Sequence, residues 1–139
     1  MRLQLLLSTV FLSLFMNQAA MAETALASGE LEGAFSSWGK SSLSGNWSVV
    51  EDQGKLYIEL ADNFAAKKGP DVKVFLSPTA SDKVTGKNAV SGSVFVKLLD
   101  DFDGSNRIAL PEGVMLDDYK SLVFHCEEFS KLWGVSSLR

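Results

Sequence analysis

The chain of 139 residues contains one cysteine, Cys126, and one histidine, His125. A single cysteine has no partner for a disulfide within the chain. A zinc or copper site would need further nitrogen or sulfur ligands, and the sequence has only carboxylates and methionines left to offer. We therefore predict neither an internal disulfide nor a metal site.

Positive charge is also scarce. Thirteen Lys and Arg residues face 17 Asp and Glu residues, which gives a net charge of −4. The basic doublet Lys67-Lys68 is typical of a solvated loop. An acidic chain without a basic cluster is not typical of proteins that bind nucleic acid or anionic membranes, so we expect no nucleic-acid partner.

Long apolar runs are missing except at the N-terminus. Arg2 precedes the run LQLLLSTVFLSLFM, and Ala20-Met21-Ala22 then fits a cleavage site. This pattern predicts a signal peptide over residues 1–22 and export to the periplasm or the extracellular space. The run is short for a membrane helix, which needs about 18 or more apolar residues. We expect no membrane span after cleavage.

After the signal peptide, helical periodicity is missing as well. Residues 23–30 are expected to be a short flexible lead-in, and residues 31–139 one domain. Four runs alternate apolar and polar residues with period two, and turn-forming segments separate them. We predict an all-β, single-domain antiparallel β-sandwich or barrel-like sandwich, with helical turns within 81–90 and 114–118. The alternating apolar positions are Trp47 and Val49; Leu56, Ile58 and Leu60; Val72, Val74 and Leu76; and Val94, Val96 and Leu98.

Patterns typical of enzymes are not found. The acidic turn at 100–106 has its glycine in the wrong place for a calcium loop. The pairs Asp117-Asp118 and Glu127-Glu128 would point to opposite faces of a strand, and no G-x-S-x-G occurs. The three tryptophans, Trp38, Trp47 and Trp133, are expected to be core residues and not a sugar-stacking platform. The sequence offers no convincing enzyme active site.

Cys126 lies in an apolar run that we expect to be a strand over 119–127. Leu122, Phe124 and Cys126 would share one face of it, and Val123 and His125 the other. The two neighbours therefore cannot bind one metal together. From position alone, Cys126 is a buried inert thiol, a thiolate for redox chemistry or cofactor ligation, or half of an intermolecular disulfide.

Several segments resemble the electron-transfer DM-thirteen domain family. The segments GKLYIEL, GPDVKVFLSP, GSNRIALPEGV and YKSLVFHCEEFSKLWGVSSL occur in the family's order, from about Leu31 to Leu138. The closing segment carries the most specific part of the likeness. The matching positions are Gly69-Pro70-Asp71, Leu76-Ser77, Tyr119, Ser121, Cys126, Phe129 and Gly134.

The resemblance implies a small extracytoplasmic β-sandwich-like domain, which in larger relatives lies beside DOMON and cytochrome-type domains. It implies electron transfer, with Cys126 as the redox or cofactor-ligating residue and a haem-like group as one candidate cofactor. Phe124, Phe129 and Trp133 are the nearest residues to line a pocket for it. His125 stands where many members carry tryptophan, so the thiol has a polar neighbour.

Two functions follow from the sequence. In the first, the protein is an exported redox accessory that exchanges electrons with a redox or cell-envelope protein through Cys126. In the second, it is a non-catalytic binding or interaction β-sandwich with a structural, buried cysteine. The cofactor, the direction of electron transfer and the oligomeric state stay open.

Overall fold

The computed structural model describes residues 23–36 and 39–139. The predicted signal peptide and Trp38 lie outside the described residues. Among the residues that are described, no helix is long and apolar enough to cross a membrane.

The described residues form strands and two short 3-10 helices, and no α-helix. All strand pairs are antiparallel, so the all-β prediction is confirmed. The strands are β1 (Ala25–Gly33), β2 (Phe35–Ser36), β3 (Gly39–Lys40), β4 (Leu43–Asp52), β5 (Lys55–Leu60), β6 (Ala65–Ala66), β7 (Val72–Ser77), β8 (Val94–Leu98), β9 (Asn106–Ala109), β10 (Ser121–Cys126) and β11 (Lys131–Ser137), with η1 (Ser81–Lys83) and η2 (Leu116–Asp118).

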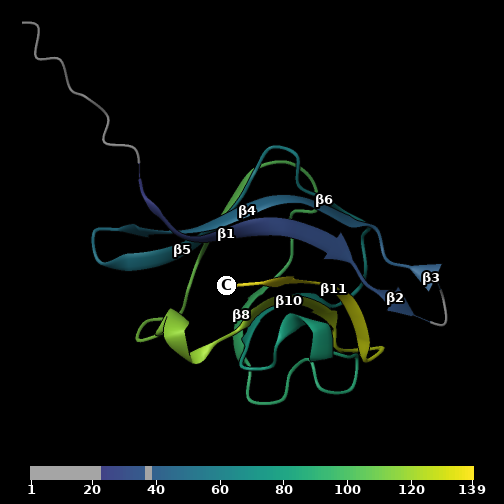
Figure 1. Cartoon of the computed structure of the whole chain (residues 1–139). Helices are drawn as coiled ribbons and strands as arrows, with labels where there is room; N and C mark the ends of the chain where they lie inside the picture. Colours follow the sequence, from purple (N-terminus) through teal and green to yellow (C-terminus); the bar gives the residue numbers. More distant parts are fainter. Residues whose placement is uncertain (1–22, 37–38) are drawn as a thin grey trace, which may run out of the picture.

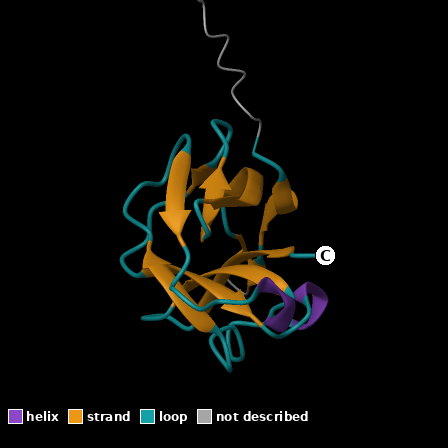
Figure 2. Cartoon of the chain, turned by 90° about the vertical axis from the view of Figure 1, so that its left-hand side faces the viewer, coloured by secondary structure: helices purple, strands orange, loops and turns teal. Residues whose placement is uncertain are grey.

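The main sheet has the strand order β8-β7-β10-β11-β1-β4-β5-β9, with β6 beside β4, while β2 and β3 form a separate hairpin. The sheet curls until its edge strands β8 and β9 contact each other. One layer contains β1, β4 and β5, and the other contains β8, β10 and β11 (Figure 1). A turned view shows the same two layers of strands (Figure 2). The fold is therefore the barrel-like sandwich that the alternation predicts.

The prediction of a flexible lead-in over residues 23–30 is wrong. Most of this segment belongs to β1, which lies inside the sheet and pairs with both β4 and β11. Five of its nine residues are exposed, and Leu31 and Gly33 are its buried positions. The strand is held by backbone hydrogen bonds on both edges, so its sequence carries little apolar alternation.

The four predicted strands and their turns are confirmed. Between β4 and β5, Asp52 pairs with Lys55 across the two residues Gln53 and Gly54. These two have φ angles of 51° and 78°, as a tight hairpin with the right-handed strand twist requires. Both 3-10 helices fall within the intervals expected to hold helical turns.

The main core fills the space between the two layers. Trp47 and Trp133 both belong to it, so the core prediction is confirmed for these two tryptophans. A smaller cluster of Phe75, Val84, Ala89 and Val123 lies apart from this core, where residues 84–89 cover β7 and β10. As a result β10 is buried on both faces.

Candidate functional site

Strand β10 carries the candidate cysteine and lies between β7 and β11. All six of its residues are buried. Leu122, Phe124 and Cys126 belong to the main core, whereas Val123 belongs to the smaller cluster. The predicted division of faces is therefore confirmed, and His125 and Cys126 point away from each other.

Cys126 is a free thiol with an exposed fraction of 0%. It is the last residue of β10, where it pairs with Val72 of β7 and Lys131 of β11. The next four residues, 127–130, form an exposed turn. The thiol is thus buried at the end of a strand, one residue from the surface along the chain.

The segment 67–71, which we call the covering loop, contacts this end of the core. A Cβ atom added to Gly69 would lie 2.9 Å from Cγ2 of Val72 and 3.1 Å from Cη2 of Trp133. The indole Nε1–H of Trp133 donates a hydrogen bond of 3.0 Å to the carbonyl oxygen of Lys67. Because Val72 pairs with Cys126, the loop and Trp133 together close the core beside the thiol.

The covering loop is also tied to the turn that follows Cys126. The backbone N–H of Glu127 donates to the carbonyl oxygen of Asp71 at 3.3 Å. The backbone N–H of Glu128 donates to the Asp71 carboxylate at 3.0 Å. The backbone N–H of Lys67 also donates to the carbonyl oxygen of Ser42 at 2.9 Å. Polar contacts of Trp133, Asp71 and the Lys67 backbone therefore hold the loop in place.

Asp71 also takes part in an ion-pair cluster. The ammonium of Lys73 lies 3.2 Å from Oδ1 of Asp71 and forms a second, shorter pair with Glu127. The hydrogen bonds that the Lys73 ammonium donates to Glu127 and, to a lesser degree, to Asp71 raise the pKa of Lys73. The cluster joins β7 to the turn after β10, on the side of the sheet where His125 lies.

His125 is 2% exposed, and its Nδ1 atom has no hydrogen-bond partner within the described residues. Its neighbours across the strands are Lys73 and Leu132. Burial lowers the pKa of His125, and the nearby Lys73 adds to this effect, while Glu127 and Asp71 oppose it. A neutral imidazole at pH 7 follows from this environment.

The structure brings together some of the predicted pocket residues. Phe124 and Trp133 share the main core with Cys126, and the Phe124 ring packs against Phe64 with their centroids 6.1 Å apart. Phe129 is 64% exposed in the turn and lies outside this cluster. Two of the three candidate lining residues therefore pack as core, and the third faces solvent.

A haem-like group does not fit beside Cys126 in this arrangement. An exposed fraction of 0% means that no void of water size touches the side chain, whereas a haem needs a cavity hundreds of Å³ in volume. A surface hollow of about 950 Å³ lies between the β4–β5 hairpin and residues 109–115, and none of its lining residues comes from β10. Among the described residues, no group of three or more His, Cys, Asp and Glu side chains could hold a metal ion.

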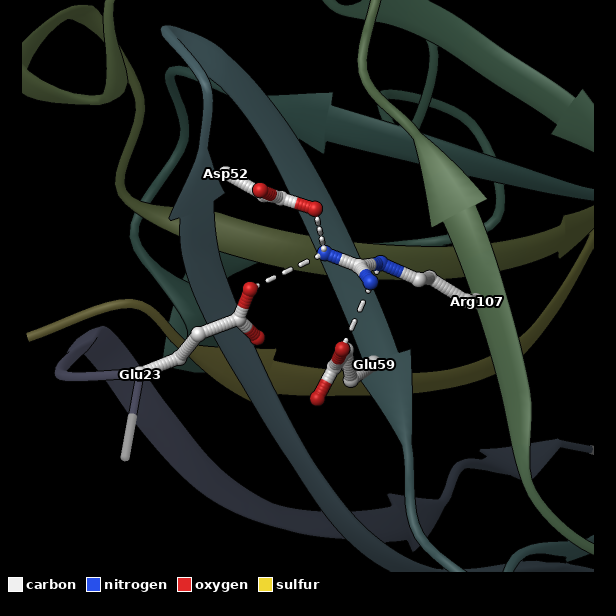
Figure 3. A network of polar contacts seen from close by, with 4 residues as sticks. All are labelled: Glu23, Asp52, Glu59 and Arg107. Carbon is white, nitrogen blue, oxygen red and sulfur yellow. Dashed lines mark hydrogen bonds and ion pairs between the residues drawn. The ribbon is translucent and has the colours of Figure 1, made fainter. Parts of the chain in front are cut away.

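One charged site has no local signal in the sequence. The guanidinium of Arg107 in β9 lies 3.3 Å from Glu23, 3.2 Å from Asp52 and 3.4 Å from Glu59, and stacks over the Tyr57 ring at 4.2 Å (Figure 3). Partial burial opposes its charge, but the carboxylates of Glu23, Glu59 and Asp52 outweigh this and raise the pKa of Arg107. Its partners lie up to 84 residues away in the chain, so spacing could not have revealed them.

A comparison with protein families finds a matching family, and Cys126 lies within the matched region. The family model described as "Electron transfer DM13" matches residues 34–138, which is most of the chain. No curated protein and no solved structure matches the chain significantly.

Proposed function

Because the chain belongs to the electron transfer DM13 family, we propose that it is an exported electron-transfer accessory protein whose redox group is the thiol of Cys126. Three features support this proposal. The family match supports electron transfer, and the pattern of residues 1–22 supports export. Cys126 is the one cysteine of the chain, so a redox role for a thiol has no other candidate.

The observation that carries the proposal is the place of the thiol in the fold. Cys126 is enclosed at the end of β10, where it pairs with Val72, and Val72 and Trp133 in turn contact the covering loop. Local openings of small loops cost far less free energy than global unfolding. Opening of residues 67–71 would expose the thiol while the rest of the barrel stays folded.

A lone thiol exchanges electrons most simply with a disulfide. The Cys126 thiolate attacks one sulfur of a partner's disulfide, so that a new S–S bond forms and the partner's second sulfur leaves as a thiolate. One thiolate of a donor dithiol then attacks the mixed disulfide at the sulfur of Cys126, which releases the partner as a dithiol. The donor's second thiolate attacks the new disulfide between the donor and Cys126, which closes the donor's own disulfide and releases Cys126 as a thiolate. The electron pair passes from the donor to the partner, and Cys126 returns to its starting state.

Thiol labelling at several denaturant concentrations tests this proposal. Cys126 is treated with the neutral disulfide 4,4′-dithiodipyridine, and the labelling rate is compared with that of a Val74→Cys, Cys126→Ser control. Val74 is also 0% exposed, but it lies in the middle of β7. We expect Cys126 to react at least about tenfold faster than the control thiol, with a denaturant dependence much weaker than that of global unfolding.

The second candidate is an extracytoplasmic interaction domain with a structural cysteine. The observation in its favour is the complete burial of Cys126 among core side chains. If Cys126 and the control thiol react at the same rate, and both only as fast as the whole domain unfolds, the redox role is lost. The interaction domain would then be the better description.

A further inference from the structure

Two phenylalanines lie exposed near the Cys126 end of the barrel. Phe35, in the β2–β3 hairpin, is 81% exposed, and Phe129, in the turn after β10, is 64% exposed. The hairpin is joined to β11, because the backbone N–H of Ala34 donates to the carbonyl oxygen of Trp133 at 3.0 Å. Both phenylalanines are therefore within a few residues of the contacts that close the core beside Cys126.

Four lysines lie in the segments that meet at this end, which are the β2–β3 hairpin, the covering loop and the start of β11. The ammonium of Lys40 lies 5.5 Å from the centroid of the Phe35 ring, and that of Lys131 lies 5.2 Å from the Trp133 ring. Lys67 and Lys68 are exposed in the covering loop itself. In the described part of the chain, none of these four lysines forms an ion pair with a carboxylate.

Acidic side chains also lie at this end. Asp71 and Glu127 share the single ammonium of Lys73, so these three groups together keep one negative charge. Glu32 and Glu128 are exposed, and no ion pair among the described residues includes them.

Asp100, which is paired with Lys97, and the exposed Asp101 follow β8, on the other side of β7 from β10 and β11. The unpaired positive charge therefore lies on the β2–β3 hairpin, the covering loop and the start of β11, although the whole chain has a net charge of −4. Figure 1 shows the β2–β3 hairpin and the β10–β11 turn at the same end of the molecule.

We propose that Phe35 and Phe129, with Lys40, Lys67, Lys68 and Lys131, form a docking surface for an acidic protein partner, in which carboxylates surround an apolar centre. This inference rests on the proposed function and names the partner of the same site. Exposed aromatics typically form the centre of an interface, and charges at the rim steer the encounter. Two of the lysines belong to the covering loop, so docking acts on the segment that encloses Cys126. Redox encounters typically use small interfaces.

A redox-inert probe tests the docking surface separately from the thiol chemistry. The probe is a synthetic peptide with one phenylalanine between two runs of four glutamates and no cysteine. It is titrated into the ¹⁵N-labelled chain that starts at Glu23, and NMR shift changes locate the binding site. We expect shifts in residues 35–36, 39–40, 67–71 and 127–131, and a clear loss of affinity at high salt because the attraction is electrostatic.

Charge-reversal variants make the test specific. Lys67→Glu combined with Lys68→Glu should lower the affinity for the peptide about tenfold, because repulsion replaces attraction at two positions. Lys55→Glu, at the first residue of β5, is a single-reversal control and should change the affinity less than about twofold. Phe129→Ser should weaken binding, whereas Phe95→Ser, at an exposed phenylalanine in β8, should not.

Several outcomes would overturn the docking surface. These are the absence of binding at low salt, shifts located elsewhere, or equal effects of Lys55→Glu and the double reversal. Since the peptide carries no sulfur, these outcomes leave the labelling test of Cys126 untouched. Conversely, an unreactive Cys126 with normal peptide binding would remove the redox role and keep the docking surface.

Discussion

Trp133→Phe should make Cys126 react faster without unfolding the protein. The indole Nε1–H of Trp133 donates to the carbonyl oxygen of Lys67 at 3.0 Å, and this hydrogen bond ties the covering loop to β11. Phenylalanine fills most of the space but has no donor. The loop then loses one of the contacts that hold it closed, while the sheet keeps its backbone pairing.

The size of the effect follows from the hydrogen bond that is lost. A neutral hydrogen bond within a protein contributes about 0.5–1.5 kcal/mol net. The free energy of loop opening should fall by a similar amount, because in the open loop the Lys67 carbonyl is hydrated. Since about 1.4 kcal/mol corresponds to a factor of ten, we expect labelling of Cys126 to be roughly twofold to tenfold faster in Trp133→Phe.

The control is Trp47→Phe. Its indole Nε1–H also donates a hydrogen bond, of 2.9 Å, to Ser136, and Trp47 is buried in the same core. Trp47→Phe should lower the free energy of global unfolding by about as much as Trp133→Phe, without loosening the covering loop. Labelling with 4,4′-dithiodipyridine and denaturant melts of both variants separate the two effects. Equal labelling rates in the two variants, at equal stability, would refute the idea that Trp133 holds the loop closed.

Three further predictions concern stability. Gly134→Ala would place a Cβ atom 2.2 Å from Leu43 Cδ2 and should destabilise the domain by about 1–3 kcal/mol in denaturant melts. Part of this loss should be recovered in a Leu43→Ala background. A loss below about 0.5 kcal/mol would contradict the predicted clash. The pKa of His125 is lowered in the folded protein, so below the unfolded value of about 6.5 the unfolded chain binds more protons than the folded one. The free energy of unfolding should therefore decrease as the pH is lowered below about 6.5, by up to about 1.4 kcal/mol per pH unit. His125→Phe should lack this component. Arg107→Gln should lower the melting temperature at low salt but much less in 1 M salt. At low salt the decrease should be larger than that of Arg139→Gln, which removes a single ion pair. Equal decreases at both salt concentrations would argue against the ionic network.

The candidate site was predictable in its local part. Period-two alternation in a strand decides which side chains share a face, so Cys126 was correctly placed with Leu122 and Phe124, away from His125. The cover over Cys126 was not predictable from the same run. It comes from residues 67–71, more than fifty positions earlier in the chain, which fold back onto Trp133 and the turn after β10.

Strand β1 shows why part of the fold escaped prediction. Its residues carry little apolar alternation, because few of its side chains enter the core. Its place between β4 and β11 depends on backbone hydrogen bonds, which every residue type except proline can form. Sequence patterns report side-chain burial, so a strand held mainly through its backbone leaves a weak signal.

The sequence by itself determined five of the strands (β4, β5, β7, β8 and β10), the turns between them, the antiparallel all-β class, the family and the face of β10 on which the cysteine lies. These are local properties, written in neighbouring residues and in the order of short motifs. Only the tertiary structure decided how deeply Cys126 is enclosed, which carboxylates surround Arg107, and that four dispersed lysines gather near two exposed phenylalanines. The burial of a side chain and the charges around it depend on residues that are distant in the chain. These residues become neighbours only when the strands pair.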